Sequence, residues 1–254
     1  MPAQTAADSA LAAIVAWWEA SARDLPWRAT RECYAVWVAE VMSAQTTVGR
    51  AAEAWVRWME RWPTVEALSR ASLREVLVQW QGLGYPRRAR DLHRAARIVA
   101  TSGWPEELTE LPGVGPYVAA AIRCFAREEP TLPIDVNVKR VLARRFPDGV
   151  DISSDPWRAG QALMEFGQRV CAARPACATC PVRPGCRGPG AGPDPRARRQ
   201  RPFAGSVRQR RGQLLARVLA EGTVAVEAAD HDVAAGLAMD GLAAFVDGRL
   251  TAPE

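Results

Sequence analysis

The chain has very few lysines and histidines. Lys139 is its single lysine, and His93 and His231 are its two histidines. So small a supply leaves little for a metal site built from several histidines, or for chemistry that pairs two imidazoles. A mechanism that needs a lysine amine as nucleophile has one residue to draw on.

Long apolar runs are also absent. No stretch reaches the roughly 18 apolar residues of a membrane-spanning helix, and residues 1–12 lack the basic start and apolar core of a signal peptide. The composition, 48% hydrophobic and 24% charged, excludes a wholly disordered, collagen-like or coiled-coil chain. We therefore expect a soluble, cytoplasmic protein without a membrane partner.

β-type alternation is scarce, so the chain is predicted to be all-α. Apolar residues recur at three- and four-residue steps between residues 6 and 170, and short separators with Pro or Gly interrupt them. The helices expected from this periodicity are Ala7–Ser21, Ala35–Ala44, Gly49–Arg61, Val65–Arg70, Leu73–Trp80, Arg87–Ala100, Pro116–Ala126, Val136–Arg145 and Pro156–Val170.

The end of the chain differs in composition from the rest. We expect a main domain over residues 1–186, a linker rich in Arg, Pro and Gly over residues 187–202, and a small winged-helix-like module over residues 203–254. In the module we expect a helix over Gln209–Ala220 and a β-hairpin at Asp247-Gly248.

The positive charge is local. Between Arg187 and Arg211 eight arginines face a single aspartate, whereas the net charge of the whole chain is +5. An arginine-rich stretch of this kind suits contact with phosphates, and it equally suits a solvated linker.

Four of the six cysteines lie close together in the sequence. Their spacing is C-x5-C-x2-C-x5-C, with prolines and a glycine that force turns between them. Four thiolates on so short a loop can enclose one metal centre, either zinc or a [4Fe-4S] cluster. The predicted ligands on this loop, residues 171–186, are Cys171, Cys177, Cys180 and Cys186.

A glycine-containing motif, L-P-G-V-G-P-Y, covers Leu111–Tyr117. Gly113 and Gly115 let a partner approach the backbone, and the helix start that follows can bind a phosphate. A plain turn between two helices explains the motif equally well. Further on, Asp135 precedes an apolar-periodic run, where it can be an N-cap or a catalytic carboxylate.

Taken together, this motif, Asp135 and the cysteine loop resemble the helix-hairpin-helix DNA glycosylases that hold a [4Fe-4S] cluster. Further segments resemble the MutY-type adenine DNA glycosylases in particular. The resemblance spans residues 10–186 and implies a bundle of two helical subdomains with a cluster loop. The segments that carry it are Arg23–Arg28, Trp37–Met42, Gly82–Tyr85, Arg88–His93 and Asp135–Val141.

The resemblance implies a monomeric, monofunctional glycosylase of base-excision repair. Its substrate would be double-stranded DNA in which adenine is mispaired with guanine or 8-oxoguanine. Glu40 would protonate the adenine, and Asp135 would stabilise positive charge on the sugar, supported by Tyr117 and Asn137. Endonuclease III-type relatives carry a lysine at the position of Tyr117 and cleave through a Schiff base, so the tyrosine implies hydrolysis alone.

The resemblance also implies residues that bind substrate and DNA. The substrate-binding residues would be Arg23, Trp27, Arg28, Gln45, Tyr85 and Gln161, and the DNA-binding residues Gly113, Val114, Gly115, Arg174 and Arg183.

Some segments depart from the family pattern. Met42–Thr46 is closer to the endonuclease III sequence, and Pro86 stands where the family has a second tyrosine. The 68 residues after Cys186 are too few and too weakly β-patterned for the Nudix-like domain that reads 8-oxoguanine. A mismatch thymine or uracil glycosylase of the same superfamily and a non-catalytic DNA-binding module therefore stay open as alternatives.

Overall fold

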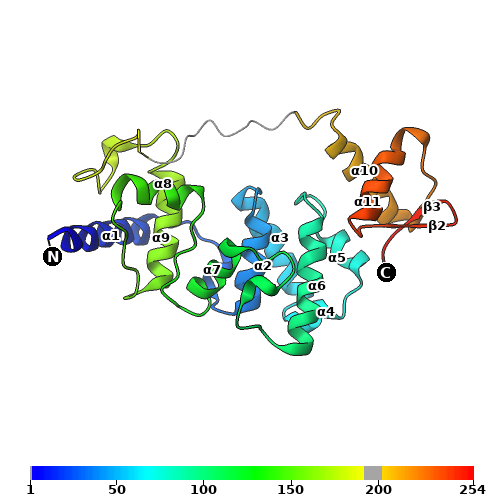
Figure 1. Cartoon of the computed structure of the whole chain (residues 1–254), viewed down its shortest axis with the longest axis horizontal. Helices are drawn as coiled ribbons and strands as arrows, with labels where there is room; N and C mark the ends of the chain where they lie inside the picture. Colours follow the sequence, from blue (N-terminus) through cyan, green and yellow to red (C-terminus); the bar gives the residue numbers. More distant parts are fainter. Residues whose placement is uncertain (1, 192–201) are drawn as a thin grey trace. The chain divides into compact units, whose positions relative to one another are not determined.

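The computed structural model describes residues 2–191 and 202–254 (Figure 1). The chain divides into two compact units, each assembled from two separate stretches. The first unit takes Met1–Trp37 and Gly115–Arg198, and the second takes Val38–Val114 and Arg199–Glu254. Helices dominate both units, which confirms the predicted all-α fold.

The first unit packs its helices around α9. This helix contacts α1, α7 and α8, and it buries Leu163 and Phe166 in the core that they share. Trp17 of α1 meets the ring of Phe166 edge-on, with the centroids 5.4 Å apart. The elements of this unit are α1 (Pro2–Ser21), η1 (Pro26–Ala29), the start of α2 (Cys33–Ser43), α7 (Pro116–Phe125), α8 (Val136–Arg145), α9 (Pro156–Arg169) and η3 (Cys177–Thr179).

A glycine in α9 brings this helix very close to α8. A Cβ atom at Gly167 would lie 2.9 Å from the carbonyl oxygen of Asn137, closer than real Cβ contacts. Glycine is therefore required at this crossing. The close approach fixes the start of α8, where Asp135 and Asn137 lie.

The second unit has a tryptophan-rich core. The ring of Trp58 lies 4.7 Å from that of Trp62 and 5.7 Å from that of Trp80, both edge-on. Helix α6 packs on α4 and α5. The helices of Val38–Val114 are the end of α2, α3 (Val48–Arg61), α4 (Val65–Ser69), α5 (Leu73–Gln79), α6 (Arg87–Ser102) and η2 (Leu108–Glu110).

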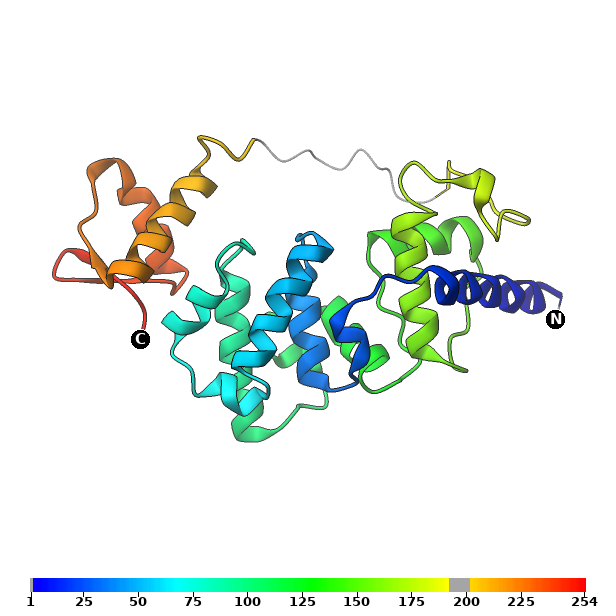
Figure 2. The ribbon, with the colours of Figure 1, turned by 180° about the vertical axis from the view of Figure 1, so that it is seen from behind.

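The C-terminal residues complete the second unit (Figure 2). Their elements are α10 (Val207–Glu221), β1 (Thr223–Val224), η4 (Ala228–Asp230), α11 (His231–Met239), β2 (Ala244–Val246) and β3 (Arg249–Thr251), with an antiparallel sheet in the order β1-β3-β2. Helix α10 packs on α5, and Arg74 donates to the carbonyl oxygen of Leu219 at 2.8 Å and 3.1 Å. The predicted hairpin is confirmed, because Asp247 and Gly248 both adopt positive φ between β2 and β3.

The predicted helices agree with the structure except at some ends. Helix α1 begins at Pro2, before the expected start at Ala7, because its first turns are alanine-rich and continue the helix without an apolar period. Helix α6 continues to Ser102 and ends at Gly103, whose φ is +76°. In the described part of the chain, no helix has the length and apolar character needed to cross a membrane.

Candidate active site

Asp135 caps the first turn of α8 and is held by three donors. Its Oδ1 accepts the backbone N–H groups of Asn137 and Val138 at 2.8 Å and 2.7 Å. Its Oδ2 accepts from Nδ2 of Asn137 at 2.7 Å. The carboxylate is therefore an N-cap in the ordinary sense, and it is also held in one orientation by a neighbouring amide.

Asn137 is in turn held by a buried arginine. Arg140 donates from Nη2 to Oδ1 of Asn137 at 2.8 Å and to the carbonyl oxygen of Gly167 at 2.7 Å. Its Nε donates to the carbonyl oxygen of Cys171 at 2.7 Å. Burial lowers the pKa of Arg140. These contacts hold the Asn137 amide that orients Asp135. Through Arg140 they also connect Asn137 to the cysteine loop.

The other two expected catalytic residues lie on other helices. Tyr117 is half-buried near the start of α7, and its hydroxyl lies 3.9 Å from Sδ of Met164 on α9. Glu40 is half-buried near the end of α2 and belongs to the second unit. Within the first unit, the structure brings Asp135 and Asn137 into direct contact.

A buried carboxylate, Glu165 of α9, holds two of the expected substrate-binding residues, Arg23 and Arg28. Its side chain is 1% exposed. Oε1 accepts from Nε of Arg23 and Nη1 of Arg169, both at 2.9 Å, and Oε2 accepts from Nη2 of Arg28 at 2.6 Å. Trp18 adds a donor at 3.2 Å. We call these five residues the Glu165 cluster.

The Glu165 cluster holds Gln161, because Nε of Arg28 donates to Oε1 of Gln161 at 2.9 Å. Trp27, next to Arg28 in η1, is half-buried. Burial alone would raise the pKa of Glu165, but the hydrogen bond and charge of Arg28, together with Arg23, outweigh it and bring the pKa to about 2. The carboxylate is thus ionised throughout the neutral range.

Glu165 did not emerge from the sequence as a site residue. The available signal was a single carboxylate inside an apolar run of α9, one helical turn after Gln161. Its arginine partners at positions 23 and 28 are more than 130 residues away in the sequence. No local pattern shows that they meet it.

The hairpin turn before α7 has the backbone that its glycines predict. Gly113 has φ +76°, and a Cβ there would lie 2.9 Å from Cβ of Asp91. The N–H of Val114 donates to the carbonyl oxygen of Leu111 at 3.0 Å, and its side chain is buried. That N–H is therefore used inside the turn. Gly115 is the N-cap of α7, where the N–H groups of the first helical turn begin.

Gln45 and Tyr85 are exposed residues of the second unit with unusual backbone. Their φ angles are +55° and +48°. Non-glycine residues rarely adopt this conformation, and where they do the surrounding contacts must enforce it. Both were expected to bind substrate.

The cysteine loop receives two N–H donors at sulfur. Nη1 of Arg144 lies 3.5 Å from Sγ of Cys171, and the N–H of Gly188 lies 3.4 Å from Sγ of Cys186. Burial raises the pKa of the Cys180 thiol, and the three neighbouring cysteine thiols raise it further. The thiol of Cys180 is therefore affected by the other three cysteines of the loop.

The cysteine loop does not gather its side chains around one centre in the described part of the chain. Among the described residues, no group of three or more His, Cys, Asp or Glu side chains is placed to hold one ion. Arg174 and Arg183 are exposed on this loop.

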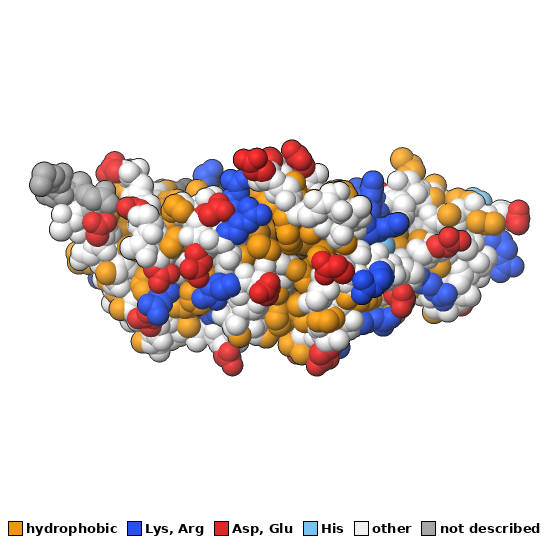
Figure 3. Space-filling view, turned by 90° about the horizontal axis from the view of Figure 1, so that it is seen from below, with side chains coloured by type: hydrophobic (Ala, Val, Ile, Leu, Met, Phe, Trp, Pro, Cys, Tyr) orange, Lys and Arg blue, Asp and Glu red, His pale blue; other side chains and the backbone are white. Residues whose placement is uncertain are grey.

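The arginine-rich stretch is only partly available for phosphates. Residues 196–201 lie outside the described residues. Further along, Arg210 pairs with Asp232 at 3.3 Å, and Arg211 pairs with Asp240. On the face drawn in Figure 3, basic side chains form small groups among apolar and acidic ones.

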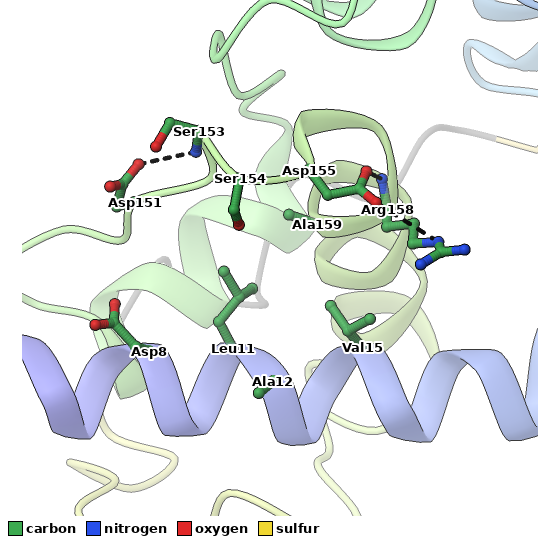
Figure 4. A pocket seen from close by; sticks show the side chains of 10 residues that line it. All are labelled: Asp8, Leu11, Ala12, Val15, Asp151, Ser153, Ser154, Asp155, Arg158 and Ala159. Carbon is green, nitrogen blue, oxygen red and sulfur yellow. Dashed lines mark hydrogen bonds and ion pairs between the residues drawn. The ribbon is translucent and has the colours of Figure 1, made fainter.

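A hollow of about 680 Å³ lies in the first unit between α1 and the loop before α9 (Figure 4). Two of its three acidic side chains bind backbone groups, since Asp151 accepts from the N–H of Ser153 and Asp155 from that of Arg158. None of the expected site residues lines it.

Comparisons with known proteins agree with this architecture. Residues 38–154 match the HhH-GPD superfamily of base excision DNA repair proteins. The chain is 38% identical over 248 residues to an adenine DNA glycosylase of Mycolicibacterium smegmatis, covering 87% of this chain and 83% of that protein. The chain belongs to the adenine DNA glycosylase family.

One further relative and one solved structure are also similar to the chain. An adenine DNA glycosylase of Mycobacterium tuberculosis (strain H37Rv) is 37% identical, over 87% of this chain and 82% of its own length. The solved structure of a thermostable thymine-DNA glycosylase superposes with a TM-score of 0.66 at 24% identity, covering 73% of this chain and 97% of its own. The latter similarity concerns the fold alone.

Proposed function

We propose that the protein is a monofunctional DNA glycosylase that acts as a monomer on double-stranded DNA. It removes adenine mispaired with guanine or 8-oxoguanine by hydrolysis of the N-glycosidic bond. The observation that carries this proposal is the Asp135 carboxylate, held by Asn137 and the start of α8. Membership of the adenine DNA glycosylase family supports the specificity for adenine.

The reaction needs two carboxylates with different tasks. As the purine leaves, positive charge develops on the sugar, and the fixed anion of Asp135 stabilises that charge. Glu40 supplies the proton that makes adenine a better leaving group. Because Arg140 holds Asn137 in place, Asp135 needs little reorganisation during the reaction.

The base itself is recognised by the residues around Glu165. Arg28 and Gln161 form a polar pair, and Arg23 and Trp27 lie in the same chain segment. A flipped base is recognised by hydrogen bonds to its edge and by stacking on an aromatic side chain. Gln161 supplies an amide for hydrogen bonds to the edge of the base, and Trp27 supplies a ring for stacking.

Tyr117 makes the enzyme monofunctional, since a phenol cannot form an imine with the sugar. The single lysine is exposed on α8, one turn beyond Asp135. We expect borohydride to trap little covalent enzyme on DNA. Efficient trapping that disappears in Lys139→Ala would assign the lysine to the reaction instead.

The cysteine loop would hold a [4Fe-4S] cluster. Its four cysteines supply thiolates only, and Arg144 and the Gly188 N–H place donors at two sulfurs, as cluster sites do. The cluster would order the loop and so present Arg174 and Arg183 to phosphate. Analysis of the purified protein for iron and sulfide tests this, and stoichiometric zinc would contradict it.

A panel of duplexes tests the proposed function. Each duplex carries one mispair, including adenine opposite guanine or 8-oxoguanine and thymine or uracil opposite guanine. We expect excision of adenine only. Excision of thymine or uracil would support the mismatch alternative, and binding without any excision would support a non-catalytic DNA-binding module.

A further inference from the structure

Two adjacent turns of the second unit carry exposed side chains on strained backbone. One turn follows α2 and contains Gln45, and the other precedes α6 and contains Tyr85. Thr46 links them through a contact of 3.5 Å from its hydroxyl to the carbonyl oxygen of Leu83. We call residues 44–46 the first turn and residues 82–86 the second turn.

A single arginine joins these two turns. Nη1 of Arg88 donates to the carbonyl oxygens of Val41 and Ala44 at 2.5 Å and 2.7 Å. Nη2 donates to those of Leu83 and Gly84 at 3.1 Å and 3.3 Å. One guanidinium therefore binds the end of α2, the first turn and the second turn at once.

The surroundings of Arg88 are neutral. Its guanidinium carbon lies 5.4 Å from the ring centre of Trp80 and 5.5 Å from that of Tyr85. Among the described residues, no carboxylate pairs with it. Burial lowers the pKa of Arg88. A cation with carbonyl and ring partners alone is costly to bury and serves to hold those partners.

Arg88 also holds the end of the helix that carries Glu40. Val41 directly follows Glu40, so the bond to its carbonyl oxygen fixes the end of the helix that carries the acid. Trp80 supports the second turn by donating from Nε1 to the carbonyl oxygen of Gly84 at 3.0 Å. Helix α10 borders the same turn across a small cavity of about 120 Å³, lined by Gly84, Pro86 and Leu215 among others.

We propose that Arg88 is a positioning residue that locks the two turns into one rigid wedge, so that Gln45 and Tyr85 enter the duplex together as the target base leaves it. The proposal rests on the proposed function, because a wedge is needed only by an enzyme that flips a base. Flipping requires unstacking of the base, and a wedge held in advance replaces the lost stacking.

Arginine is suited to this task and lysine is not. The planar guanidinium directs its donors to several carbonyl groups in fixed directions, whereas an ammonium group is a compact charge on a flexible stem. Arg87, the adjacent residue, provides a matched control. Its side chain is 66% exposed and contacts Asp240 at 3.5 Å.

The test compares two duplexes that carry the same adenine–guanine mispair. In one the mispair is flanked by matched pairs, and in the other by mismatches that already unstack the adenine. On the stacked duplex we expect Arg88→Met to slow single-turnover excision about tenfold or more, because the cost of unstacking the adenine is then no longer offset by the wedge. On the unstacked duplex we expect the same variant within about threefold of the wild type, because the wedge is dispensable there.

Two variants sharpen the result. Arg88→Lys should lie between Arg88→Met and the wild type on the stacked duplex, and Arg87→Met should match the wild type on both. Equal slowing of Arg88→Met on both duplexes would overturn the proposal in favour of a folding defect. Wild-type rates on both would overturn it as well.

A second readout separates this proposal from the proposed function. With 2-aminopurine in place of the target adenine, its fluorescence rises when the base is flipped. We expect Arg88→Met to lose most of that rise. If the wild type excises no adenine from either duplex, the proposed function fails, and the fluorescence rise still decides whether Arg88 supports flipping.

Discussion

The molecule has two charged centres of opposite design. In the first unit, the carboxylate of Glu165 gathers three arginines. In the second unit, the guanidinium of Arg88 gathers four backbone carbonyl oxygens. Both centres hold residues of the expected substrate site, but only the first is built from ion pairs.

The two centres position their neighbours in different ways. Glu165 does so through ion pairs, and Arg88 does so through hydrogen bonds to backbone carbonyl oxygens. Loss of the carboxylate leaves three cations close together, two of them part-exposed, so the cost falls on folding. Loss of the guanidinium leaves uncharged carbonyl oxygens at the end of α2 and in the two turns, so the cost falls on the conformation of those turns. Substitution of Glu165 should therefore lower the free energy of unfolding, whereas substitution of Arg88 should impair base flipping.

The largest expected effect on stability is that of Glu165→Gln. The amide keeps the shape but removes the charge that balances the arginines, and we expect a loss of about 3 kcal/mol in the free energy of unfolding. Chemical denaturation at pH 7 measures it. A loss below about 1 kcal/mol would mean that solvent already screens the arginines, and the contrast between the two centres would disappear.

The pH dependence of the free energy of unfolding tests the same role of Glu165. Because the pKa of Glu165 is lowered from 4.5 to about 2, its contribution is fully present above pH 4.5 and is lost as the pH falls through 2. The linked free energy is about 3 kcal/mol. Denaturation of wild type and Glu165→Gln between pH 5 and pH 2 should show their difference shrinking as the pH falls. A constant difference would contradict the low pKa.

The smallest expected effect is that of Arg88→Met on stability. Its partners are uncharged, so we expect a loss of about 1 kcal/mol. Since no carboxylate of the described residues pairs with Arg88, this loss should not change between pH 5 and pH 2. The same denaturation series checks both statements. A loss as large as that of Glu165→Gln would make Arg88 a core element of the fold.

Much of the fold follows from the sequence. Apolar periodicity predicts the helices because each must bury one face, and Asp247-Gly248 predicts its hairpin because both residues tolerate positive φ. Asp135 was predictable as an N-cap because a cap depends on residues two and three positions away.

Other parts of the site depend on contacts that the sequence does not show. Arg88 stands beside Arg87 in an arginine-rich run, and only the fold makes one half-buried and the other exposed. Arg210 and Arg211 looked like phosphate ligands, but the acidic residues that pair with them come later in the chain. The resemblance supplied the proposed catalytic residues, whereas the residues that orient Asp135 and Asn137 became visible only in the structure.

The roles of the two proposed catalytic carboxylates are measured by single-turnover excision of adenine opposite guanine. We expect Glu40→Gln and Asp135→Asn each to lower the rate about a hundredfold or more, with duplex affinity nearly unchanged, because each removes an interaction made in the transition state. We expect Lys139→Ala to retain the wild-type rate. Near wild-type rates in both carboxylate variants would show that neither carboxylate takes part in excision.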